Sequence, residues 1–180
     1  MVMDRLSPTK ESKDQALLQL YRHWNERRGD RLFPAPKDID QTDFTYASER
    51  VSMIEVSYDP LRFRYWSVAP QLTAHLGYNM TGSYVDEVPE PSMRQFVRAC
   101  YERVIQSRAP VYEMGTVLIR LDEWWHEVLV LPLSSDGSNI DMLLAYRSTV
   151  PPVAVKGHPI DARRAHAPPL ATSKSNNDSR

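Results

Sequence analysis

The chain has 180 residues, of which 42% are hydrophobic and 25% charged, and its formal net charge is −1. These values are typical of one globular domain, and the near-neutral charge argues against nucleic acid or an anionic membrane as the main partner. Cys100 is the only cysteine, which excludes an intrachain disulfide, and no apolar run resembles a membrane span or a secretion signal, so we expect a cytoplasmic location.

The first periodic pattern predicts an amphipathic helix over residues 11–28. Ser12 and Gln15 have the spacing of a capping box, and Gly29 is suited to end the helix. One face of this helix carries an apolar stripe, which consists of Leu17, Leu20, Tyr21 and Trp24. The stripe must be buried either on the sheet of its own chain or on the same helix of a second chain. We expect the second arrangement, a homodimer through these residues.

A β-hairpin is predicted after this helix. Residues 31–40 contain two prolines and read as a loop, and Asp40 is suited to cap a short helix over 40–49. Residues 52–58 alternate between apolar and polar side chains, as a half-buried strand does. Asp59 and Pro60 form a turn signal before a second strand over 62–68.

Two helices and three strands complete the predicted core. Pro70 suits the first turn of a short helix that Gly77 ends, and apolar residues recur at helical spacing over 91–107. Three strand-like runs follow, over 111–121, 124–133 and 140–146. Two strands, then helices, then three strands favour an antiparallel sheet over the alternation of a parallel α/β fold.

The stretch LGYNMTGSYVDEVPEP resembles the middle of a PAS domain. The residues that carry the resemblance are Leu76, Gly77, Tyr78, Gly82, Val85 and Asp86. The leading helix adds a narrower likeness to single-domain bacterial PAS proteins. The resemblance implies an α+β, PAS-like five-stranded antiparallel sheet with helices on one face, preceded by the amphipathic helix. We divide the chain into a flexible N-terminus (1–10), the helix with a Pro/Asp-rich connection (11–50), the PAS domain (51–150) and a disordered tail (151–180).

PAS folds often enclose an apolar cavity between the sheet and the long helix, a shape that suits a small apolar or amphipathic ligand. A solid core would use the same residues, so both readings stay open. The residues expected to line the cavity are Leu72, Leu76, Met93, Phe96, Val97, Cys100, Val117, Ile119, Val128 and Met142.

We expect no metal site and no cofactor. His75 and His126 lie nearest to the expected cavity, but no histidine pair has the i, i+4 spacing of a helical zinc site, and no Cys-x-x-Cys is present. Haem is not expected, because the long helix carries no histidine. Flavin is not expected either, because photoactive flavin-binding PAS domains carry an Asn-Cys-Arg-Phe-Leu segment where this chain has Gly-Ser-Tyr-Val-Asp at residues 82–86.

The resemblance implies a stand-alone sensory or regulatory protein that acts on an unidentified signalling protein, gated by a ligand. No nucleophile motif, P-loop or dinucleotide fingerprint is present, so we expect no enzymatic activity. Two alternatives remain. One is a ligand-free interaction or adaptor module with a filled core. The other is a small cone-shaped α+β enzyme or binding protein, against which the early hairpin argues.

Overall fold

The computed structural model describes residues 12–119 and 122–150, so the predictions for 1–10 and 151–180 lie outside the described residues. Its centre is an antiparallel five-stranded sheet with the order β2-β1-β5-β4-β3. The predicted hairpin and sheet type are therefore confirmed. The strands are β1 (Val51–Ser57), β2 (Arg62–Ser67), β3 (Val111–Ile119), β4 (Asp122–Leu133) and β5 (Met142–Val150).

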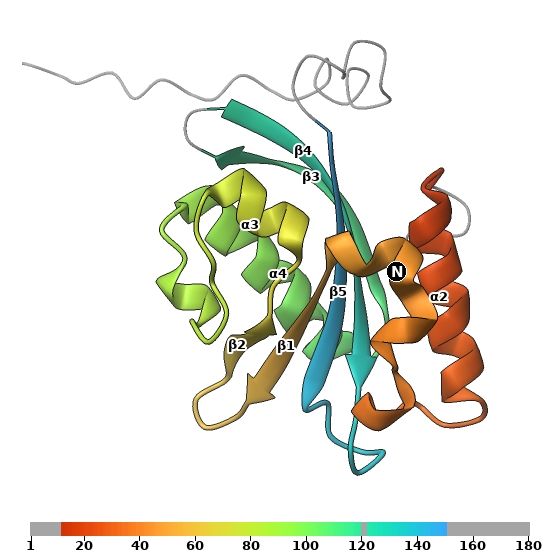
Figure 1. Ribbon diagram of the computed structural model, residues 1–180. Coiled ribbons are helices and arrows are strands. Elements are labelled where there is room, and N and C mark those ends of the chain that lie inside the picture. Colours follow the sequence, from red (N-terminus) through yellow and green to blue (C-terminus); the bar gives the residue numbers. More distant parts are fainter. Residues whose placement is uncertain (1–11, 120–121, 151–180) are drawn as a thin grey trace, which may run out of the picture.

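Helices cover both faces of the sheet (Figure 1). The face that carries α3 (Pro70–Leu76) and α4 (Pro91–Ser107) is called the inner face below. The opposite, outer face is covered by α2 (Gln15–Arg28). Short 3₁₀ segments connect these elements: η1 (Pro36–Asp38), η2 (Gln41–Arg50) and η3 (Val85–Glu87). Within the described residues, none of the helices is long and apolar enough to cross a membrane.

The strand β5 is buried on both faces because helices cover both faces of the sheet. Successive side chains of a strand point to opposite faces, so Leu144 and Tyr146 face outward, while Leu143 and Arg147 face inward. Leu143, Leu144 and Tyr146 are each 0% exposed. The strand begins at Met142 rather than at residue 140, and it extends to Val150.

The helix α2 begins later than its capping box predicts. Asp14 is the N-cap, since its carboxylate accepts hydrogen bonds from the backbone N–H groups of Ala16 and Leu17 at 3.0 and 3.3 Å. The hydroxyl of Ser12 instead accepts from the backbone N–H of Asp14. A carboxylate at this position also interacts favourably with the helix dipole, so the choice of Asp14 over Ser12 is physically reasonable.

A hydrogen-bonded network anchors the start of α2 to the sheet. The hydroxyl of Tyr146, on the outer face of β5, donates to the Asp14 carboxylate at 2.7 Å. Arg50, the last residue of η2, donates to the same hydroxyl at 2.9 Å and to Asp14 at 3.2 Å. Burial is the main cause that raises the pKa of Tyr146, so the hydroxyl keeps its proton and remains the donor to Asp14.

Replacing Tyr146 with phenylalanine is expected to lower the free energy of unfolding by about 1 to 2 kcal/mol, because Asp14 and Arg50 both lose a partly buried partner. Urea denaturation measures the change. Tyr58→Phe is the matched control: that ring is 48% exposed and its hydroxyl donates to the Ile140 carbonyl. An equal effect of the two substitutions would show that the network does not hold α2.

Candidate functional site

Nine of the ten predicted cavity residues lie between the inner face and the helices that cover it. Leu72 and Leu76 come from α3, and the apolar side of α4 faces the sheet. All nine are buried except Phe96, which is half-buried. The nine are Leu72, Leu76, Met93, Phe96, Val97, Cys100, Val117, Ile119 and Val128. Their role in holding a ligand stays a prediction.

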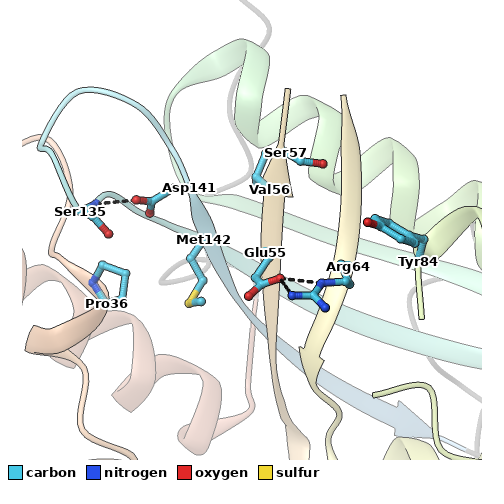
Figure 2. A pocket seen from close by; sticks show the side chains of 9 residues that line it. All are labelled: Pro36, Glu55, Val56, Ser57, Arg64, Tyr84, Ser135, Asp141 and Met142. Carbon is cyan, nitrogen blue, oxygen red and sulfur yellow. Dashed lines mark hydrogen bonds and ion pairs between the residues drawn. The ribbon is translucent and has the colours of Figure 1, made fainter. Parts of the chain in front are cut away.

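Met142 lies on the outer face, away from the other nine. It pairs with Glu55 of β1 and Leu133 of β4, whose side chains share the outer face. Figure 2 shows it between Pro36 and the ion pair of Glu55 with Arg64. These residues line a depression of about 520 Å³. The prediction that Met142 lines the cavity is wrong, because strand parity places it with Leu144 and Tyr146 on the outer face of β5.

The inner face carries buried polar side chains that sequence analysis missed as a group. His126 of β4 is 0% exposed and Arg147 of β5 is 8% exposed. The register pairs His126 with Thr149, two residues beyond Arg147. Both ring nitrogens of His126 and the Nη1 atom of Arg147 are buried without a hydrogen-bond partner in the described part of the chain. Because a buried polar atom without a partner costs about 1 to 3 kcal/mol, these atoms require an explanation.

The groups around Arg147 are held neutral. Burial, followed by the charge of Arg147, lowers the pKa of His126 from 6.5 to about 2. Burial raises the pKa of the Cys100 thiol to about 11, and it also raises the pKa of Tyr101. Glu113 faces inward on β3, but it forms an ion pair with Arg103 of α4. The guanidinium of Arg147 is therefore a positive charge in neutral surroundings.

A small crevice connects Arg147 to the surface between α3 and β5. It holds about 10 Å³, roughly the space that one water molecule needs. The Thr149 hydroxyl and the Nδ1 atom of His75 lie 3.3 Å apart at its wall, and the His75 ring lies against Trp124 with centroids 4.7 Å apart. The lining residues are Arg50, Ala69, Gln71, Leu72, His75, Arg147 and Thr149.

The ring of Phe96 lies close to His126 and to Gly115 on the inner face. Its centroid lies 6.4 Å from that of His126. Gly115 of β3 makes room for this ring, since a Cβ atom added there would lie 2.7 Å from the Cε2 atom of Phe96. The absence of a side chain at Gly115 thus fixes where Phe96 can pack.

Replacing Gly115 with alanine is expected to destabilise the protein by about 1 kcal/mol, because the added methyl group displaces the Phe96 ring. In a Phe96→Ala background the same substitution should cost much less. A double-mutant cycle in urea measures this coupling. A coupling free energy of zero in this cycle would mean that Gly115 and Phe96 do not pack together.

The stripe predicted to form a dimer is buried within its own chain. Leu17 and Leu20 are 0% exposed and Trp24 is 3% exposed, while Tyr21 is half-buried. The indole Nε1 of Trp24 donates to the Pro132 carbonyl of β4 at 2.9 Å. The structure thus shows the first of the two arrangements left open by the sequence. A homodimer through these residues stays a prediction, and it would require α2 to leave the sheet.

No protein-family model and no curated protein matches this sequence. A light-oxygen-voltage domain studied with a flavin analogue matches in fold, with a TM-score of 0.51 and 9% identity over 69% of this chain and 93% of that chain. A sensory box histidine kinase/response regulator from Burkholderia thailandensis E264 matches with a TM-score of 0.42 and 18% identity, over 69% and 92% of the two chains. A Rhodobacter sphaeroides LOV protein matches with 0.45 and 11%, over 71% and 74%. The predicted fold is confirmed.

The first of these matches corrects the expectation about cofactors. Flavin was not expected because residues 82–86 lack the cysteine segment. That exclusion is wrong, because the domain with this fold was studied with a flavin analogue. The absence of this segment therefore does not exclude a flavin.

Proposed function

We propose that this chain, which has the PAS fold, is a sensory regulatory protein that binds a small molecule between its inner face and α4. One observation supports this function above all. His126 is fully buried, and neither of its ring nitrogens has a partner in the described residues. A ligand that accepts or donates at the imidazole would remove the free-energy penalty of these atoms.

The strand β5 provides a route from the ligand to the outer face. Arg147 faces inward, and its neighbour Tyr146 faces outward and bonds to the N-cap of α2. A ligand can shift this equilibrium only as far as it binds one arrangement better than the other. We propose that a second protein, in a bacterial cytoplasm, recognises the outer side of α2, and that the chain acts by binding and not by catalysis.

A homodimer is part of this proposal. Because the apolar stripe of α2 is already buried in its own chain, a dimer through that stripe would form by exchange of α2 between two chains. Light scattering distinguishes the cases. One chain has a mass of 20.8 kDa, so an exchanged dimer doubles this value, and a monomeric solution at all concentrations would rule the dimer out.

A flavin at the inner face would meet the Arg147 guanidinium, but the crevice beside Arg147 holds only about 10 Å³, so the covering helices would have to move to admit the ring. The Arg147 guanidinium could donate to a carbonyl oxygen of the flavin ring, and the flat side chains of Phe96 and Trp124 lie near the inner face. A bound flavin would supply visible absorption and redox chemistry. Cys100, with its pKa raised to about 11, would remain a protonated thiol beside it.

Native mass spectrometry and an absorption scan of the purified full-length chain test the proposed function. We expect a bound small molecule that is lost from His126→Phe, which keeps a ring of similar size without nitrogens. His23→Phe is the control, because His23 lies on α2 and its Nε2 atom faces Asp43. If the wild-type chain is empty and transparent, the protein is instead a ligand-free interaction module, an outcome that the small size of the crevice favours.

A further inference from the structure

The lining of the crevice between α3 and β5 includes two arginines, Arg50 and Arg147. The other polar side chains of its lining are neutral. Gln71 and Thr149 carry no charge, and burial and the charge of Arg147 lower the pKa of His75, so its imidazole is neutral at pH 7. None of the lining residues is a carboxylate. The charged residues of this lining are therefore both arginines.

The two arginines differ in whether their charge is balanced. Arg50 donates to Asp14 and to the hydroxyl of Tyr146, so its charge is paired. Arg147 is 8% exposed, and its Nη1 atom is buried without a partner in the described residues. A buried guanidinium without an anion is strongly unfavourable. With Arg50 paired, about one positive charge, that of Arg147, is left without a counterion.

We propose that the crevice binds the carboxylate of a small organic acid, with Arg147 as its main donor. This inference rests on the proposed function and gives the ligand a charge and an entry point. The closed crevice admits about one oxygen atom, because it holds about 10 Å³. The rest of the ligand extends from the crevice into solvent, or α3 moves to make room for the whole ligand. A carboxylate carries one negative charge and accepts two parallel hydrogen bonds from an arginine.

Arg50 couples the crevice to α2. The same side chain lines the crevice and donates to the N-cap Asp14 and to Tyr146. A carboxylate in the crevice attracts Arg50 and competes with Asp14 for it. Binding is therefore expected to loosen the first turn of α2, which begins next to Asp14. The occupied state differs from the empty state on the outer face, where we propose the partner protein binds.

Thermal unfolding of the full-length chain, at constant ionic strength, tests the proposed site with sodium acetate, propionate, phosphate and chloride. At ten times the dissociation constant, a carboxylate should raise Tm by about 3 to 5 °C. Arg147→Met should weaken binding by about 10- to 100-fold, and Arg147→Lys by less, since it keeps the charge but not the paired donors. Arg98→Gln is the control, because Arg98 is exposed and pairs with Glu102 on α4.

Hydrogen exchange of the wild-type chain keeps the test decisive if Arg147→Met does not fold. Acetate should accelerate exchange at the backbone amides of Ala16 and Leu17, which Asp14 caps. An equal Tm rise in Arg147→Met, a rise with phosphate or chloride alone, or unchanged exchange would overturn the inference. If native mass spectra show a molecule that binds wild type and Arg147→Met equally, the carboxylate site is wrong while the proposed function stands.

Discussion

Replacing Trp24 with alanine is expected to lower the free energy of unfolding by about 3 to 5 kcal/mol, the range for removing a large buried aromatic side chain. Trp24 is 3% exposed, and its ring joins α2 to β4 through the hydrogen bond to the Pro132 carbonyl. The substitution removes the packing and also leaves that carbonyl without its donor. Urea denaturation followed by circular dichroism measures the change.

Two further variants separate packing from hydrogen bonding at this position. Trp24→Phe keeps a buried ring but removes the donor, so it should cost less than Trp24→Ala. Trp66→Ala is the control, because Trp66 is 52% exposed and its loss should change stability by only about 0.5 kcal/mol. A loss below about 1 kcal/mol for Trp24→Ala would mean that α2 does not dock on its own sheet in solution.

Because of His126, the free energy of unfolding is expected to decrease as the pH is lowered. The decrease should be smaller in the His126→Phe variant than in the wild type. Burial keeps this imidazole neutral in the folded protein, where its pKa is about 2, while the unfolded chain takes up the proton near pH 6.5. Between these values the unfolded state binds more protons, so lowering the pH stabilises it. Each pH unit below 6.5 costs about 1.4 kcal/mol.

Between pH 7 and pH 5 the wild type should therefore lose about 2 kcal/mol more than His126→Phe. Urea midpoints at a series of pH values, with constant ionic strength, measure the difference. His75 acts in the same direction, because its pKa is also lowered, but it is present in both proteins and cancels in the comparison. Parallel stability curves for the two proteins would show that His126 is not buried as a neutral group.

Several elements follow directly from local sequence. The helix α4 has the bounds that its apolar period and Pro91 predict, Pro91–Ser107. Pro70 begins α3 and Gly77 ends it in the left-handed conformation, with φ 77°. Asp40 caps η2 through a hydrogen bond to the backbone N–H of Thr42, as its position indicates. Such signals act within a few residues of the chain, so the sequence contains them in full.

Local sequence leaves the structure ambiguous where two residues can fill the same role. Ser12 and Asp14 can both cap the first helix, and only packing against Tyr146 and Arg50 favours Asp14. The absence of the cysteine segment predicts no flavin, and the match to a domain studied with a flavin analogue shows that this exclusion is wrong. The role of the predicted cavity residues stays a prediction, apart from Met142, which strand parity places on the other face.

The sequence by itself determined the order of helices and strands and favoured the antiparallel sheet, because periodicity, caps and turns are local. The PAS-type fold was implied by the family resemblance of residues 76–86. Only the tertiary structure decided which surface buries the stripe of α2, because an apolar stripe specifies burial but not its partner. It also decided that His126 and Arg147 share the inner face. Their placement on the same face depends on the register of β4 with β5. This register is set by the packing of the whole sheet and not by either strand alone.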